Sequence, residues 1–165
     1  MDPVVRVGLG YDLHRLEKGR KLVLAGIEVP FEMGLAGHSD ADVCLHAIID
    51  ALLGAAGLSD IGEQFPDTDP AYKDIDSAML VVRAMKKITT HGYKVINIDA
   101  TIICQAPKLS PFKNDMANRV AHLLDIEPSA VSIKAKTDEG VGVVGESKAI
   151  ACHVVVALGI KKASV

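Results

Sequence analysis

The segment that most constrains this fold runs from Gly34 to Gly62, GLAGHSDADVCLHAIIDALLGAAGLSDIG. Its middle, residues 41–57, has the length and composition of a single helix. Ser39 is predicted to cap this helix, with Asp42 three residues later as the returning partner of a capping box. The segment that follows is almost wholly apolar, with the large side chains Val43, Leu45, Ile48, Ile49, Leu52 and Leu53. Such a helix is buried on nearly all sides, so the rest of the chain must pack around it.

Three polar residues interrupt the apolar surface of this helix. Asp42, His46 and Asp50 recur at every fourth position and form one stripe. Burying a polar group without a partner costs about 2–7 kcal/mol, so the stripe must face something polar. One interpretation is a bound metal or an anionic ligand. The other is that His46 is a core histidine satisfied by the two carboxylates, and the helix alone does not decide between them.

Composition places the chain among globular proteins. Its 165 residues, 49% hydrophobic and 24% charged, are predicted to form one domain spanning 1–165. A net charge of −3 gives no basic footprint for nucleic acid, and no apolar run approaches the roughly 20 residues of a membrane span. Three scattered cysteines suit a reducing compartment. We therefore expect a cytoplasmic protein, or one of a plastid-type organelle if a transit peptide has been removed.

The remaining hydrophobic patterns predict both strands and helices. Strands are predicted at 4–9, 94–103, 131–136 and 149–158, a hairpin at 21–32, and helices at 76–91 and from Ser110 onward. The second helix is expected to carry its apolar stripe at Met79, Val82, Met85 and Ile88, and the third to bury Phe112, Met116, Val120 and Leu123. Because strands and helices do not alternate strictly, the predicted fold is α+β: a mixed β-sheet with three helices packed on one face plus a β-hairpin.

The last predicted strand, IACHVVVAL, is apolar on both faces. If three helices cover one face of the sheet, a partner subunit is the simplest cover for the other.

A metal site is indicated by Asp12-Leu13-His14 together with His46. If the chain stays extended at this point, Asp12 and His14 point to the same side. Two imidazoles and one carboxylate, with a fourth position open, is the pattern of catalytic zinc sites. Iron and manganese are also compatible with these ligands. Asp50, one turn past His46, either orients that ligand or caps a turn elsewhere.

Phosphate-binding candidates flank the predicted helices. His38 and Ser39 lie before a helix N-terminus, where free N–H groups attract phosphate, although Ser39 also fits a plain cap. Lys134, Lys136, Thr137 and Glu139 flank a glycine-rich turn that is either an anion nest with a Mg²⁺ ligand or a charged surface loop. The run 65–70, FPDTDP, favours a turn first and a binding loop second. These residues together indicate a metal-dependent enzyme acting on phosphate esters or anhydrides.

Four stretches occur in the chain in this order: GYDLHRL, the 34–62 segment, FPDTDP and IICQAPKL. On these stretches the chain closely resembles the 2-C-methyl-D-erythritol 2,4-cyclodiphosphate synthase family. The resemblance covers residues 5–158. It implies a phosphorus-oxygen lyase of the non-mevalonate isoprenoid pathway that converts 4-diphosphocytidyl-2-C-methyl-D-erythritol 2-phosphate to the 2,4-cyclodiphosphate and releases CMP. It also implies a homotrimer assembled through the sheets, with active sites at the subunit interfaces and no nucleic-acid or membrane partner.

The resemblance also implies a role for each matching residue. One Zn²⁺ per subunit would bind Asp12, His14 and His46, and Mg²⁺ or Mn²⁺ would bind Glu139 with the nucleotide diphosphate. His38 and Thr137 would stabilise the transition state. The implied substrate-binding residues are Asp12, His14, His38, Ser39, Asp60, Ile61, Gly62, Phe65, Pro66, Asp67, Thr68, Asp69, Cys104, Gln105, Ala106, Pro107, Lys108, Leu109, Ser110, Lys136, Thr137, Asp138 and Glu139.

The chain departs from the family in the loop after Glu139, where many members carry an aromatic residue and an Arg and this chain has Val143 and Glu146. In those members the pair lines a cavity on the threefold axis that holds an isoprenoid diphosphate. Two other functions use the same residues: a metal-dependent phosphatase or nucleotide hydrolase, and a non-catalytic trimeric module that binds diphosphates.

Overall fold

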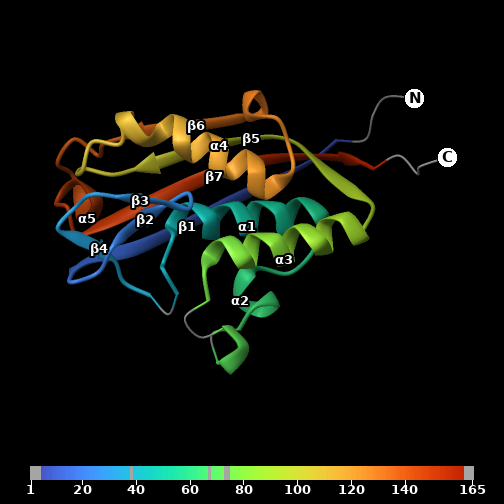
Figure 1. The fold of residues 1–165 in the computed structure, drawn as a ribbon, viewed down its shortest axis with the longest axis horizontal. Coiled ribbons are helices and arrows are strands. Elements are labelled where there is room, and N and C mark those ends of the chain that lie inside the picture. Colours follow the sequence, from blue (N-terminus) through green and yellow to red (C-terminus); the bar gives the residue numbers. More distant parts are fainter. Residues whose placement is uncertain (1–4, 38, 67, 73–74, 162–165) are drawn as a thin grey trace.

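The computed structural model describes residues 5–37, 39–66, 68–72 and 75–161. Its centre is a five-stranded sheet in the order β4-β1-β7-β5-β6, beside a two-stranded hairpin of β2 and β3 (Figure 1). The β5–β6 pair is parallel and the other pairs of the large sheet are antiparallel, which confirms the predicted mixed sheet. The strands are β1 (Val5–Lys18), β2 (Leu22–Leu24), β3 (Ile27–Val29), β4 (Met33–Leu35), β5 (Tyr93–Ile103), β6 (Val131–Lys136) and β7 (Ala149–Ile160).

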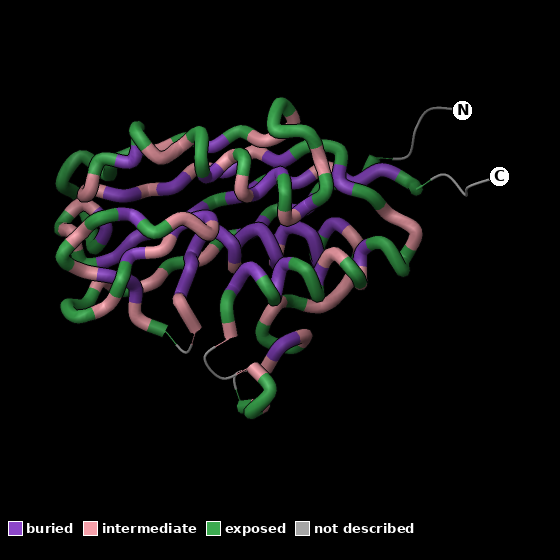
Figure 2. The backbone as a smooth tube through the Cα atoms, viewed as in Figure 1, coloured by how far each residue is buried: buried purple, intermediate pink, exposed green. Residues whose placement is uncertain are grey.

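Three long helices, α1 (Val43–Ala56), α3 (Ser77–Thr90) and α4 (Lys113–Leu124), form the layer on one face of this sheet. Helix α1 packs on β1 and β7, α3 packs beside α1, and α4 packs on β6. Figure 2 shows that the buried backbone is concentrated in α1 and the central strands. Two short helices, α2 (Ile61–Gln64) and α5 (Gly142–Gly145), complete the α-helices of the described residues. Among those residues, no helix has the length and hydropathy needed to cross a membrane.

Strand β1 is longer than the sequence pattern predicts. The strand expected at 4–9 continues past Asp12 and His14, and pairs with β7 from Val5 to Arg15. The continuation contains charged residues and glycine, so it shows no hydrophobic pattern typical of a strand. It still forms a strand because the hydrogen bonds to β7 involve only backbone groups. Because side chains alternate along an extended strand, Asp12 and His14 share one face of the sheet.

Two glycines on that same face set how closely α1 approaches β1. A Cβ on Gly8 would lie 1.9 Å from Ala51 O, and one on Gly10 would lie 1.8 Å from Ala47 O. Both distances are far below a van der Waals contact, so only glycine allows the helix to lie this close to the strand. Continuing by twos along β1, the next residues facing α1 are Asp12 and His14.

Helix α1 begins differently from the prediction. Asp42, not Ser39, is its N-cap: Asp42 Oδ1 accepts from Cys44 N at 3.1 Å and from Leu45 N at 3.0 Å. The predicted capping box is therefore wrong. Ser39 Oγ instead accepts from Ala41 N at 3.0 Å, one turn ahead of the helix.

The same Asp42 carboxylate also holds the hairpin. It accepts from Ala25 N at 2.9 Å and from Gly26 N at 2.6 Å, the two turn residues between β2 and β3. Ala25 and Gly26 have φ values of 53° and 74°, as a tight hairpin turn requires. The predicted hairpin is confirmed, and its anchor is a buried carboxylate that caps α1.

The helix predicted at 76–91 is α3, and its predicted apolar stripe is wrong at Met79 and Val82 but right at Ile88, which is buried, and Met85, which is half-buried against the core. Met79 and Val82 are 51% and 47% exposed, whereas Val81, Ala84 and Ile88 are buried. Helix α3 carries apolar residues on two neighbouring arcs, and only the position of α1 decides which arc is buried.

The third predicted helix also starts later than expected. A 3₁₀ turn at Ser110–Phe112 precedes α4, and no side chain caps it, so Ser110 is not an N-cap. Met116 and Val120 are buried as predicted.

The face of the sheet opposite α1 is apolar and largely open. Val7 and Leu9 of β1 are 66% and 69% exposed, and Tyr11 is 51% exposed. The sequence predicts this open face on the last strand, but among the large exposed hydrophobic side chains of the open face β7 contributes only Val155. At one end of β7, Val144 of α5 packs on this side of the sheet in a small separate cluster.

Candidate active site

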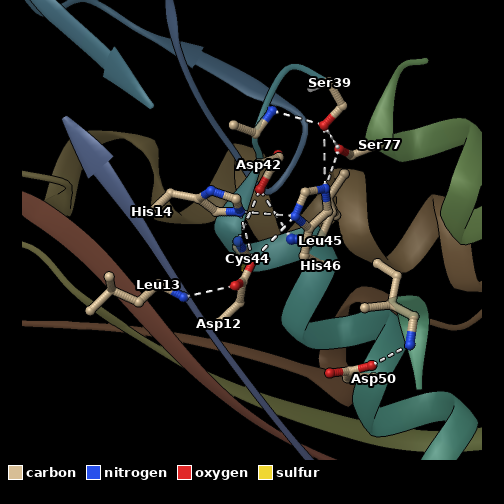
Figure 3. Close-up of polar contacts among 12 residues, drawn as sticks. Asp12, Leu13, His14, Ser39, Asp42, Cys44, Leu45, His46, Asp50 and Ser77 are labelled. Atoms are coloured by element: carbon tan, nitrogen blue, oxygen red, sulfur yellow. Dashed lines mark hydrogen bonds and ion pairs between the residues drawn. The ribbon is translucent and has the colours of Figure 1, made fainter. Parts of the chain in front are cut away.

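Three potential metal ligands meet where β1 passes the first turn of α1 (Figure 3). Asp12 Oδ2 lies 2.8 Å from His14 Nε2 and 3.1 Å from His46 Nδ1. The two ring nitrogens, His14 Nε2 and His46 Nδ1, are 3.1 Å apart. Among the described residues, this is the only group of three or more His, Cys, Asp or Glu arranged to hold a metal ion. The set proposed from the sequence is therefore brought together by the fold.

The outer nitrogen of each histidine is held by an oxygen. His14 Nδ1 lies 2.9 Å from the carbonyl oxygen of Ala36, and His46 Nε2 lies 2.9 Å from Ser77 Oγ. A carbonyl oxygen only accepts, so His14 carries its proton on Nδ1, and Ser77 likewise favours a proton on His46 Nε2. The inner nitrogens then present lone pairs toward Asp12, which is the arrangement that metal-binding histidines need.

The electrostatics of the cluster agree with a cation at its centre. Burial alone would raise the pKa of Asp12, but hydrogen bonds and charge interactions with His14 and His46 outweigh it and hold that pKa well below its usual range. Burial would lower the pKa of His14, but Asp12 raises it above its ordinary value of 6.5. A carboxylate whose pKa is held this low, beside a histidine whose pKa is raised, marks a position where positive charge is stabilised. The donor set fits a zinc-type metal.

The polar stripe predicted on α1 does not converge on this site. Asp42 serves as helix cap and hairpin anchor, as described above. Asp50 Oδ1 accepts from Ile61 N at 2.8 Å, so it holds the start of α2. Of the stripe, only His46 belongs to the metal cluster, and the second interpretation of Asp50, a cap elsewhere, is confirmed.

A cavity of about 330 Å³ opens beside the metal ligands. Five residues that the sequence proposed as ligands or substrate contacts line it with His46: His14, Ser39, Ile61, Gly62 and Phe65. Gly37, Tyr72, Ile75 and Leu80 complete the wall and were not expected from the sequence. A larger groove of about 810 Å³ lies between α3, α4 and β5, away from the metal ligands, and we assign the chemistry to the smaller cavity.

Other predicted residues near this cavity shape its loop. Asp60 Oδ1 accepts from Glu63 N at 3.0 Å and caps α2, and Asp69 Oδ1 accepts from Ala71 N at 2.9 Å. Pro66 and Thr68 lie in the same loop, whereas His38 and Asp67 lie outside the described residues.

A second group of predicted residues gathers at the ends of β5 and β6. Cys104 N donates to Lys136 O at 2.8 Å, which joins the run Cys104–Ser110 to the loop after β6. In that loop Thr137 Oγ1 donates to Glu139 Oε1 at 2.8 Å, and Gly140 N approaches Gln105 Oε1 at 3.5 Å. Among the described residues, none from 104–110 or 136–139 lines the cavity beside the metal ligands. Within one chain, the two groups are therefore separate.

Ser77 and Asp40 also belong to the site and were not among the predicted residues. Ser77 is fully buried, and its hydroxyl donates to Asp40 Oδ1. In the sequence, the only notable feature of these two residues is that each lies at the start of a predicted helix. Ser and Asp at such positions are ordinarily interpreted as N-caps, not as site residues.

Comparisons with known proteins agree with this arrangement. The YgbB family matches residues 5–159. A curated 2-C-methyl-D-erythritol 2,4-cyclodiphosphate synthase from Caldicellulosiruptor bescii is 52% identical over 151 residues, which is 92% of this chain and 96% of that protein. A CDP complex of IspF from Plasmodium falciparum has a TM-score of 0.84 at 33% identity, over 98% of this chain and 100% of that one. The bifunctional IspDF from Campylobacter jejuni has a TM-score of 0.92 at 40% identity, over 96% of this chain and 43% of that longer one.

Proposed function

The chain belongs to the YgbB family of 2-C-methyl-D-erythritol 2,4-cyclodiphosphate synthases, and from this membership we propose how its own residues carry out the reaction. As a member, it is a cyclising lyase of isoprenoid biosynthesis. Its substrate is 4-diphosphocytidyl-2-C-methyl-D-erythritol 2-phosphate. The 2-phosphate oxygen forms a bond to the β-phosphorus, the bond from that phosphorus to the CMP oxygen breaks, and CMP leaves.

The nucleophile in this step is already an anion, so no general base or nucleophilic side chain is required. The requirement is to neutralise charge and to align the attacking and leaving oxygens. The convergent donors of Asp12, His14 and His46 are the observation that carries this proposal, because they provide a cation site at the wall of a cavity.

We assign Zn²⁺ to Asp12, His14 and His46, and Mg²⁺ or Mn²⁺ to Glu139 with the nucleotide diphosphate. When bound, these ions supply Lewis-acid polarisation and positive charge at the phosphoryl oxygens. The acidity of Asp12 and the oxygen-held outer nitrogens of both histidines support the first assignment. Glu139, exposed beside Thr137, is open to a metal ion and its phosphate ligands.

The substrate-binding residues divide between the two groups of loops. Ser39, with His38, is assigned to the substrate phosphates, the run 60–62 to the ribose, and the run 65–69 to the erythritol pocket. The run Cys104–Ser110 is assigned to cytosine, and 136–139 to the nucleotide diphosphate. His38 and Thr137 are assigned to transition-state stabilisation.

The complete site is proposed to form between neighbouring subunits of a homotrimer. Two observations support this: the two groups of loops are separate within one chain, and the open apolar face of β1 needs a cover. The CDP complex of the Plasmodium falciparum relative supports a cytidine nucleotide as ligand. A cytoplasmic location stays a prediction.

Product analysis tests this function directly. Protein, substrate, Zn²⁺ and Mg²⁺ are incubated and followed by ³¹P NMR, with a chelator-treated reaction as control. We expect CMP and a cyclic diphosphate, with no inorganic phosphate. Release of inorganic phosphate would instead identify a phosphatase or nucleotide hydrolase, and bound substrate without turnover would identify a binding module; family membership favours neither.

A further inference from the structure

A buried serine contacts the outer nitrogen of His46. Ser77 Oγ lies 2.9 Å from His46 Nε2, and Ser77 has no exposed surface. Ser77 is in the first turn of α3 and His46 in the first turn of α1, so the contact joins the N-terminal ends of two helices far apart in sequence (Figure 3).

The direction of this hydrogen bond is set by a third residue. The Ser77 hydroxyl donates to Asp40 Oδ1, and Asp40 Oδ2 accepts from Ser77 N at 3.2 Å. A carboxylate only accepts, so the hydroxyl proton points to Asp40 and the Ser77 oxygen must accept from His46. His46 therefore carries its proton on Nε2 and turns an unprotonated Nδ1 toward Asp12.

Ser39 is the other hydroxyl near this nitrogen and is less suited to hold it. Ser39 Oγ is 3.4 Å from His46 Nε2 and already accepts from Ala41 N at 3.0 Å. The other histidine of the site is held in a different way, because His14 Nδ1 donates to the backbone oxygen of Ala36. Only His46 depends on a side chain, and so only its orientation can be changed by substituting a partner.

We propose that Ser77, oriented by Asp40, is a positioning residue that fixes the tautomer and ring orientation of His46 and thereby sets the metal affinity of the site. This inference rests on the metal site of the proposed function. Without the Ser77 hydroxyl, the His46 ring is free to rotate and its proton is free to occupy Nδ1, where it blocks metal binding. Loss of such a partner commonly weakens metal binding by roughly 10–100-fold.

A purely structural role for Ser77 predicts a different pattern. Ser77 follows the N-cap of α3, Asp76, whose Oδ1 accepts from Ala78 N at 2.7 Å. If Ser77 merely secures the start of α3, then Asp76→Ala, which removes the cap, should reduce metal binding in the same way. If Ser77 positions His46, Asp76→Ala should lower the melting temperature and leave the zinc affinity unchanged.

The experiment compares wild type, Ser77→Ala, Asp40→Ala and Asp76→Ala at full length. Zinc affinity is measured by chelator competition, and imidazole N–H resonances are recorded on the zinc-loaded proteins. Ser77→Ala should bind zinc about 10–100-fold more weakly and lose the protected His46 Nε2–H resonance. The His14 Nδ1–H resonance should remain, as an internal control. Asp40→Ala keeps the hydroxyl but removes its acceptor and should also weaken binding, which keeps the test decisive if Ser77→Ala misfolds.

The outcomes separate this inference from the proposed function. If wild type binds zinc tightly and Ser77→Ala keeps both that affinity and the His46 resonance, the positioning role is wrong but the zinc assignment stands. If only Asp40→Ala folds, an unchanged zinc affinity in that variant leads to the same conclusion. Equal weakening in Asp76→Ala would also overturn it, in favour of a structural role. Wild-type protein that binds no zinc would refute the zinc assignment, and this inference with it.

Discussion

Gly10→Ala tests whether the metal site depends on the close approach of α1 to β1. The added Cβ would lie 1.8 Å from Ala47 O, and real Cβ atoms essentially never lie within 3.0 Å of a heavy atom beyond their own residue and its chain neighbours. The obstacle is a backbone oxygen inside a helix, which cannot rotate away. Strand and helix must therefore separate locally by more than 1 Å, roughly the difference between those two distances.

Two effects of this separation can be estimated. Overpacking a core typically costs about 1–3 kcal/mol and occasionally more, and a backbone obstacle places this variant at the upper end. For a chain of this size, each 1 kcal/mol shifts the melting temperature by roughly 2–4 °C. His46 precedes Ala47, so the same movement draws His46 Nδ1 away from Asp12 Oδ2, now 3.1 Å distant. Because metal sites tolerate only about 0.5 Å of misplacement, zinc affinity should fall together with stability.

The matched control is Gly54→Ala, in the same helix. A Cβ on Gly54 would meet nothing within 4 Å, so alanine should stabilise this variant by up to about 1 kcal/mol through helix propensity. Denaturant unfolding at fixed protein concentration, with and without zinc, compares the two variants with wild type. Gly10→Ala that unfolds at the wild-type midpoint and binds zinc normally would refute the reasoning.

Four further predictions concern the metal, the base, pH and the loop after β6. His46→Ala should lose zinc and activity yet stay folded; stoichiometric zinc in this variant by elemental analysis would show that the site is misassigned. CDP should raise the melting temperature more than ADP, UDP or GDP, because a mismatched base leaves backbone groups of Cys104–Ser110 unpaired at about 1–3 kcal/mol each; equal shifts would contradict cytosine recognition. Since Asp12 raises the pKa of His14, a proton competes with zinc there, so affinity measured by chelator competition should begin to fall at a pH above 6.5 on acidification; a pH-independent affinity would exclude this competition. In the proposed homotrimer three Glu146 carboxylates would surround the threefold axis, and Lys148, which lowers their pKa, keeps them ionised. They offer an anion no hydrogen-bond donor, so native mass spectrometry should show no retained geranyl diphosphate; one tightly bound prenyl diphosphate per trimer would show that Lys148 compensates this charge and would overturn the prediction.

Local patterns predicted most of the fold. The hairpin, the three long helices and four of the five other strands follow from apolar periodicity and from turn residues such as Ala25-Gly26, whereas β4 was not predicted. These signals are local, because hydrogen bonding within a helix or a tight turn depends on residues a few positions apart. The predictions failed where competing local options were equal, as at the cap of α1, where Ser39 and Asp42 both fit.

The sequence by itself determined which side chains are available for chemistry at the site. Asp12 and His14, two apart in the chain, needed only an extended backbone to share one face, and His46 was the single histidine in an apolar helix. The resemblance to the synthase family rests in part on the stretches that contain these residues, and it implies the reaction from the sequence alone.

Only the tertiary structure decided how these side chains are held. Asp42 and Asp50 repeat with His46 at helical spacing, yet neither carboxylate joins the metal cluster. Asp42 accepts from a backbone N–H of the hairpin, and Asp50 accepts from the N–H of Ile61 at the start of α2. Ser77 touches His46 although 31 residues separate them. Such contacts depend on the distance between packed elements, which Gly8 and Gly10 of β1 set here by allowing α1 to lie close to the strand. No local sequence pattern predicts that distance.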